Sequence, residues 1–131
     1  MALIWVDNIE ERTKKNRTFR TVLRVGAHSE LTAMSIEPGD DIGLEVHPNI
    51  DQFLRIEAGQ AQIKVGPAKD DLSETYDVKE EWAFIIPAGT WHNVINTGTT
   101  PLQLYTVYSP PNHAEGTVHA TKADAEAAEQ A

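Results

Sequence analysis

The sequence predicts a single all-β domain, either a sandwich or a closed barrel. At 131 residues the chain has the length of one domain that can bury a sizeable core. Its middle is a succession of short runs rich in β-branched, aromatic and aliphatic residues, most of them bounded by Gly, Pro, Asn or Asp. No segment repeats at a period of roughly 20–50 residues, so a solenoid is not expected.

The chain divides into three parts. Residues 1–18 are expected to form an N-terminal arm or strand, residues 19–110 the β-domain, and residues 111–131 a C-terminal segment with a short helix. About eight strands at this spacing favour a sandwich or barrel. The predicted strands are Phe19–Val25, Glu30–Ile36, Asp41–His47, Gln52–Ala58, Gln60–Gly66, Glu81–Ala88, Trp91–Asn96 and Pro101–Tyr108.

Two segments differ from this pattern. The stretch Gly66–Glu81 is polar and is predicted to be an exposed hairpin loop. In the tail TKADAEAAEQA, Thr121 is followed three residues later by Asp124, which indicates a capping-box-like start of an alanine-rich helix. A helix of about ten residues is marginal in water by itself, so it is expected to dock on the domain.

Composition excludes several classes of protein. The chain has no cysteine, which rules out disulfides, thiolate metal sites and a cysteine nucleophile. Its 11 basic and 20 acidic residues give a net charge of −9, which argues against nucleic-acid binding. No apolar run approaches the roughly 18 residues needed to cross a membrane. The first residues lack the features of a secretory signal, so a cytoplasmic protein is expected.

The stretch GLEVHPNIDQF carries a first group of candidate functional residues. Side chains at i and i+2 of a strand share a face, so Glu45 and His47 project together. In the strand that follows, Arg55 and Glu57 have the character of solvent-facing residues, which places Gln52 on the inward face. Glu45, His47 and Gln52 can therefore converge inside a barrel if the residues between them make the turn.

A second group lies in EWAFIIPAGTWHNVIN, where Pro and Gly interrupt the strand and His92 begins the next one. Together the two stretches resemble the motifs of the cupin family of small jelly-roll barrels. The residues that match the family motifs are Gly39, His47 and Gly59 in the first, and Pro87, Gly89, His92 and Asn96 in the second. The wider sequence is similar to small bacterial single-domain cupins described as mannose-6-phosphate-isomerase-like. The resemblance implies a cupin jelly-roll barrel over residues 19–110, followed by the short C-terminal helix.

Three residues depart from the family pattern. Glu45 stands where the first motif has its first His, Gln52 stands where it has Glu, and Glu81 replaces the opening Gly of the second motif. Carried over by position, the resemblance implies that a divalent transition metal such as Zn, Mn, Fe, Ni or Co is bound by Glu45, His47, Gln52 and His92. Two imidazoles and a carboxylate suit such ions, and the Gln52 amide oxygen is a weaker neutral donor.

An alternative without a metal is a hydrogen-bonded polar pocket in which Glu45 pairs with a protonated His47. A buried carboxylate with no neutralising partner is costly, which favours a cation of some kind.

Three functions follow from this resemblance. The first is a metal-dependent enzyme that isomerises or ring-opens a small polar substrate such as a sugar or sugar acid, with Glu45 as third ligand or as catalytic base. The alternatives are a metal-dependent oxygenase and a non-catalytic small-molecule-binding cupin. The resemblance also implies a homodimer.

Other polar residues carry weaker expectations. His28 is expected in a loop, whereas His113 and His119 lie in a segment that could fold across an opening of the barrel. In the last predicted strand, Gln103, Tyr105 and Val107 share a face. A polar pocket suits that face better than the apolar one, so Tyr105 is predicted to place its hydroxyl in the pocket.

Overall fold

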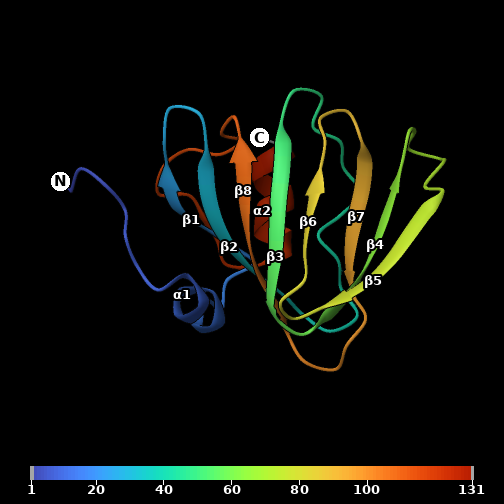
Figure 1. Ribbon diagram of the computed structural model, residues 1–131, viewed down its shortest axis with the longest axis horizontal. Coiled ribbons are helices and arrows are strands. Elements are labelled where there is room, and N and C mark those ends of the chain that lie inside the picture. Colours follow the sequence, from blue (N-terminus) through green and yellow to red (C-terminus); the bar gives the residue numbers. More distant parts are fainter. Residues whose placement is uncertain (1, 131) are drawn as a thin grey trace.

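Nine strands and two helices make up residues 2–130, which are the residues that the computed structural model describes (Figure 1). Met1 and Ala131, the ends of the two predicted terminal parts, lie outside the described residues. The helices are α1 (Ile9–Lys15) and α2 (Lys122–Gln130). The strands are β1 (Arg20–Val25), β2 (Glu30–Ile36), β3 (Asp51–Ala58), β4 (Gln60–Gly66), β5 (Glu74–Lys79), β6 (Ala83–Ile86), β7 (Trp91–Asn96), β8 (Leu102–Ser109) and β9 (Val118–His119).

The strands form two antiparallel sheets. One has six strands in the order β6-β3-β8-β2-β1-β9, and the other has three in the order β5-β4-β7. In Figure 1 the three-stranded sheet lies at one side of the molecule, and α2 lies behind β8 and β3. Neighbours such as β3 and β8 are far apart in the sequence, as expected for a jelly roll. The predicted all-β class and the short C-terminal helix are confirmed.

Alternation of side chains explains why these runs form half-buried strands. In β7, WHNVIN, the side chains of His92, Val94 and Asn96 are buried while those between them are partly exposed. In β3 the residues Gln52, Leu54 and Ile56 are buried in the same way. Glu57, which was expected to face solvent, is buried too and pairs with Arg55. Both patterns have the period of two that places every second side chain inside the barrel.

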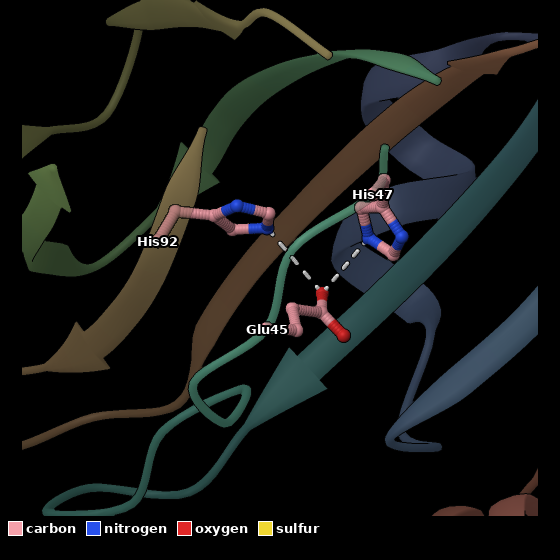
Figure 2. Close-up of side chains that lie close together, drawn as sticks. All are labelled: Glu45, His47 and His92. Atoms are coloured by element: carbon pink, nitrogen blue, oxygen red, sulfur yellow. Dashed lines mark hydrogen bonds and ion pairs between the residues drawn. The ribbon is translucent and has the colours of Figure 1, made fainter. Parts of the chain in front are cut away.

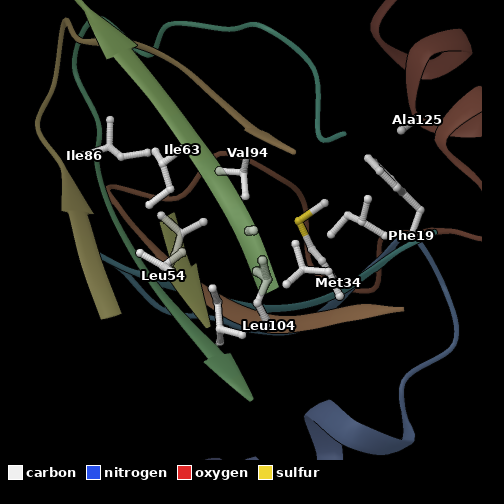
Figure 3. Close-up of a cluster of buried hydrophobic side chains, with 13 residues drawn as sticks. Phe19, Met34, Leu54, Ile63, Ile86, Val94, Leu104 and Ala125 are labelled. Atoms are coloured by element: carbon white, nitrogen blue, oxygen red, sulfur yellow. The ribbon is translucent and has the colours of Figure 1, made fainter. Parts of the chain in front are cut away.

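The core lies between the two sheets (Figure 3). Leu54, Ile56, Met34 and Leu104 are fully buried and come from adjacent strands of the larger sheet. Ile63 and Val94 contribute from the smaller sheet. Complete burial of an aliphatic side chain of this size stabilises the folded state by about 1.5–3 kcal/mol. This cluster therefore accounts for much of the stability of the fold.

The prediction of a strand over Asp41–His47 is wrong. This segment forms only two isolated bridges, between Asp41 and Ile95 and between Glu45 and His92. Gly43 has a φ of 110°, a backbone conformation that interrupts an extended strand. The segment follows the edge of β7 without forming a continuous ladder, and the Glu45 bridge holds it beside His92.

Three elements were not predicted by the sequence analysis: α1, β5 and the two-residue strand β9. The predicted hairpin loop at 66–81 contains β5, which pairs with β4 along its whole length. Its side chains are mostly exposed, so its sequence lacks the apolar alternation of a half-buried strand. Within the N-terminal part, α1 begins after Asn8, whose side chain accepts a hydrogen bond from the backbone N–H of Glu11.

The C-terminal helix α2 docks on the barrel as expected. The backbone N–H of Asp124 donates to the Thr121 hydroxyl and the N–H of Thr121 donates to the Asp124 carboxylate, which completes the predicted capping box. Ala125 is buried in the core cluster. Lys122 forms ion pairs with Asp40 and Asp41, which join the helix to the segment before Glu45.

Candidate metal centre

Three of the four predicted ligands gather at one place inside the barrel. The side chains of Glu45, His47 and His92 point toward one another (Figure 2), and each offers a ligand atom within 4.8 Å of the other two. The Oε1 atom of Glu45 lies 3.3 Å from Nε2 of His47 and 3.5 Å from Nε2 of His92. One carboxylate oxygen is thus shared by two imidazoles.

Backbone hydrogen bonds tie the two motifs together at this point. The N–H and carbonyl groups of Glu45 and His92 bond reciprocally, at 3.0 and 2.9 Å. The backbone N–H of Gly89 donates to the carbonyl of His47 at 2.9 Å. Gly89 has a φ of 81°, which favours glycine, so the turn before β7 holds the backbone of His47 while it leads into His92. The side chains converge because the backbones are joined.

The tautomer of His92 follows from its partners. Its Nδ1 lies 2.9 Å from the carbonyl oxygen of Thr90, which can only accept, so Nδ1 carries the hydrogen. In a neutral imidazole, Nε2 then has a lone pair and no hydrogen. That atom is buried, has no hydrogen-bond partner and faces the carboxylate of Glu45. Two electron-rich atoms that face each other favour a cation between them, and a carbonyl that fixes the other ring nitrogen is the usual support of a metal-binding histidine.

The electrostatics of Glu45 fit the same arrangement. Burial acts to raise the pKa of Glu45, but the neighbouring imidazoles, first that of His47 and then that of His92, outweigh burial and lower the pKa to about 2. Glu45 is therefore an anion at neutral pH. Two imidazoles and one carboxylate form the donor set that divalent transition metals accept, and these residues could hold such an ion.

Gln52, the fourth predicted ligand, lies on the inward face of β3, opposite Tyr108 of β8. Its Nε2 donates to the hydroxyl of Thr106 at 3.1 Å. Its amide oxygen is buried and has no hydrogen-bond partner. A buried acceptor without a partner is unusual in a native protein, so an electropositive group at this place would satisfy it. Its role as a ligand stays a prediction.

The prediction that Tyr105 faces the pocket is wrong. The face that points inward carries Leu102, Leu104, Thr106 and Tyr108, all fully buried, whereas Tyr105 is partly exposed and packs against Phe53. Tyr108 was missed. Its ring lies edge-on to His47 at 5.9 Å, and burial raises the pKa of its hydroxyl far above the ordinary value, so the hydroxyl stays protonated.

The remaining histidines separate into two kinds. His28 is exposed in the turn between β1 and β2, as predicted. His113 reaches the barrel interior, where its ring lies 5.3 Å from that of Tyr108 and its Nδ1 lies 2.9 Å from a carboxylate oxygen of Glu30. His119 lies next to His113 at 6.4 Å and is hydrogen-bonded to Arg20.

Glu30 anchors this segment. It is fully buried and accepts hydrogen bonds from the backbone N–H groups of Asn112 and His113 and from the hydroxyl of Thr32. Burial acts to raise the pKa of Glu30, but the contacts of His113 and Thr32 outweigh burial and lower the pKa. Sequence reasoning missed the contact between Glu30 and His113, because nothing in a single sequence indicates that two residues so far apart along the chain are in contact.

Fold and site together define a small single-domain jelly-roll barrel with a His/Glu cluster inside it. The model of the cupin domain matches residues 32–108, more than half of the chain. This protein belongs to the cupin family.

Two curated relatives share most of the chain. The Bacillus subtilis protein YrkC is 59% identical over 125 residues, which are 95% of this chain and 67% of that protein. Protein L612 of Acanthamoeba polyphaga mimivirus is 41% identical over 116 residues, which are 88% of this chain and 71% of that protein. The narrower resemblance to mannose-6-phosphate-isomerase-like proteins stays a prediction.

Among solved structures, the crystal structure of BH2720 from Bacillus halodurans superimposes with a TM-score of 0.93 and 54% identity, covering 94% of this chain and 93% of that one. Within residues 2–130, no helix is long and apolar enough to cross a membrane.

Proposed function

We propose that this cupin is a metal-dependent enzyme that isomerises or ring-opens a small polar molecule such as a sugar or sugar acid. The observation that carries the proposal is the unpaired Nε2 of His92, buried and directed at the ionised carboxylate of Glu45. A structural polar cluster would pair this nitrogen with a donor. A centre built for a cation leaves it free.

The donor set suits Zn, Mn, Fe, Ni or Co, and such an ion polarises a carbonyl group and lowers the pKa of a neighbouring hydroxyl. His47 and His92 would hold it, with Glu45 as the third ligand and Gln52 as a candidate fourth. A carboxylate with a pKa of about 2 is a weak base, which supports Glu45 as a ligand over Glu45 as a catalytic base.

Metal analysis tests the centre directly. We expect purified protein, after dialysis, to retain about one equivalent of a divalent transition metal, and His92→Ala to lose most of it, because the variant removes one of the imidazole donors. His28→Ala is the matched control, since that histidine is exposed in a turn. Equal metal contents in wild type and His92→Ala would refute the centre.

A substrate screen tests the activity. Sugars and sugar acids are incubated with metal-loaded protein while product and dissolved oxygen are followed together. Conversion without oxygen consumption is expected, because isomerisation and ring opening consume none. The His47→Ala variant should not convert the substrate.

The second candidate function is a metal-dependent oxygenase, which is favoured by the pair of histidines and single carboxylate in Glu45, His47 and His92. Oxygen uptake that depends on substrate would establish this function in place of the first. A non-catalytic binding protein would bind a member of the screen and leave it unchanged.

A homodimer is also proposed. The N-terminal residues Leu3, Ile4 and Val6 are largely exposed in the single chain, and a partner subunit would cover such apolar side chains. Light scattering after size exclusion should give twice the mass of one chain, and deletion of residues 2–6 should reduce it to the single-chain mass.

A further inference from the structure

Arg20, the first residue of β1, is a buried cation without a carboxylate partner. Only 3% of its surface is exposed. Its guanidinium lies over the ring of Phe19, and Nη1 lies 3.1 Å from Nδ1 of His119. Its Nε is buried with no hydrogen-bond partner. Among residues 2–130, no ion pair joins Arg20 to an acid.

This arrangement is costly for the folded protein by itself. A guanidinium stays charged at any physiological pH, and a buried charge without an opposite charge loses its hydration without replacement. A neutral imidazole and an aromatic face compensate only in part. The nearby buried acid Glu30 is already committed to Thr32 and to the segment that carries His113. Arg20 therefore has binding capacity for an anion that the chain does not supply.

Arg20 is one of the residues that line a cavity of about 270 Å³. Glu45 lines it as well, together with Lys122 and Ala125 of α2. Because Glu45 belongs to the candidate metal centre, this cavity connects Arg20 with the surroundings of that centre. The volume equals that of roughly nine water molecules, so it suits a molecule of a few carbon atoms.

The other charges of the cavity do not provide a second anion site. Lys122 already pairs with Asp40 and Asp41. Glu126 and Glu129 are exposed on α2, where salt screens their repulsion of an entering anion. Arg20 is the lining cation without an acidic partner.

We propose that this cavity binds a small organic acid whose carboxylate pairs with the guanidinium of Arg20 while the rest of the molecule faces Glu45. This inference rests on the proposed function and narrows its substrate class from polar molecules in general to carboxylates. A guanidinium offers a carboxylate two parallel N–H donors, so Arg20 would select an acid over the corresponding alcohol.

Two pairs of probes test this selection: glycolate beside ethylene glycol, and D-galacturonate beside D-galactose. Each pair differs in one carboxylate. Binding to metal-loaded protein is measured by calorimetry, and the unfolding temperature is measured with and without each probe. We expect both acids to bind and to raise the unfolding temperature, and both neutral partners to do neither.

The Arg20→Met variant separates recognition from structure. We expect acid affinity to fall about 30-fold or more, as for the loss of one partner of a buried charge pair, with metal content unchanged. Its unfolding temperature without acid should be equal to or above that of wild type, since an uncompensated buried charge has been removed. Arg24→Met, on the same strand and outside the lining of this cavity, is the control and should bind both acids as wild type does.

Three results would overturn the inference: acids and neutral partners that bind equally, acids that do not bind to metal-loaded protein, or Arg20→Met that binds acids as wild type does. If Arg20→Met fails to fold, a crystal structure of wild type soaked with D-galacturonate decides. A carboxylate on Arg20 supports the proposal, and a carboxylate elsewhere refutes it. Wild-type protein that holds no metal would instead refute the proposed function. Metal analysis measures this independently of acid binding, so the two failures can be distinguished.

Discussion

Two rows of side chains cross the same three strands and have opposite character. In the apolar row, Met34 of β2, Leu104 of β8 and Ile56 of β3 lie side by side, fully buried. In the polar row of the same strands, the neighbours are Glu30, Tyr108 and Gln52, also almost fully buried. Burial of the first row stabilises the fold, whereas burial of the second is costly unless every polar group has a partner.

The polar row itself divides into satisfied and unsatisfied groups. The Glu30 carboxylate is surrounded by donors and anchors the segment at Asn112 and His113, so its burial has a structural explanation. The amide oxygen of Gln52 has no such explanation. Outside the row, Nε2 of His92 on β7 and Nε of Arg20 on β1 are unsatisfied as well. Near the polar row, unsatisfied atoms, more than polarity as such, indicate where we propose that a ligand binds; the remaining unsatisfied side-chain atom buried within residues 2–130, Oγ1 of Thr13, belongs to α1.

The largest expected effect lies in the apolar row. Leu104→Ala should lower the free energy of unfolding by about 2–5 kcal/mol, because it removes buried methyl groups and leaves a cavity. Metal content per folded molecule should not change. Urea unfolding and metal analysis measure the two quantities. Val107→Ala, on the outward face of the same strand, is the control and should cost much less. Loss of metal from the folded Leu104→Ala protein would contradict the separation of the two rows.

The second-largest effect is expected from acid, which should destabilise the part of the barrel that contains Glu45 and Glu30. The pKa of Glu45 is lowered from 4.5 to about 2 in the folded state, and that of Glu30 is also lowered. A carboxyl group with a lowered folded-state pKa contributes stability above its unfolded value and loses it as the pH falls through the folded value. Stability of metal-free protein should therefore decline between about pH 4.5 and pH 2.

The Glu45→Gln variant sharpens this test, since it removes one of the carboxyl groups whose pKa is lowered in the folded state. Its stability, measured by urea unfolding across the same window, should fall less steeply than that of wild type. Identical slopes would mean that Glu45 is not held as an anion by His47 and His92.

Much of this comparison could be predicted from the sequence, because a period of two determines which side chains share a face. That rule placed Gln52 inward, whereas the resemblance to the cupin motifs joined His92 to Glu45 and His47, in a segment that forms no continuous strand. The same rule failed for Tyr105, because it does not say which of two faces is buried. The inward face of β8 mixes Leu104 with Thr106 and Tyr108, so the more polar face was the wrong choice.

Other misses have their own physical reasons. The strand β5 lies at the edge of its sheet with exposed side chains, so burial left no pattern in its sequence. The helix α1 had available signals in the cap Asn8 and the acidic first turn of Glu10 and Glu11, which were not used. Arg20 had none, since an arginine in a strand is usually solvent-facing and only coordinates show it buried.

Gln52→Met tests whether the polar row exists for a ligand. The variant keeps the volume of the side chain and removes the unsatisfied oxygen, while the hydroxyl of Thr106 keeps its bond to the carbonyl of Phe53 at 2.9 Å. Stability of metal-free protein should change by less than about 1 kcal/mol, or rise. Metal affinity, from competition with a chelator, should fall at least about tenfold. Unchanged affinity would remove Gln52 from the centre.

The smallest effect concerns Glu81. Like Gln52, it departs from the cupin motifs and lies outside the cluster of Glu45, His47 and His92. Its φ is 76°, and no other non-glycine residue within 2–130 has a positive φ. A side chain in this conformation destabilises the folded state by about 1–2 kcal/mol. Glycine removes this strain, but the greater entropy of its unfolded state offsets about half of the stabilisation. Glu81→Gly should thus raise the free energy of unfolding by about 0.5–1 kcal/mol, as measured by urea unfolding, with metal affinity unchanged.

The neighbouring Glu80→Gly is the matched control, because Glu80 is exposed in the same turn and has no positive φ. It should lower stability, since glycine there adds unfolded-state entropy and relieves no strain. Opposite signs at two adjacent glutamates would show that the departure at Glu81 concerns backbone conformation alone. A change of metal affinity in Glu81→Gly would instead connect the turn before β6 to the polar row. In that case Gln52 would not be the single departure, outside Glu45, His47 and His92, that affects metal binding.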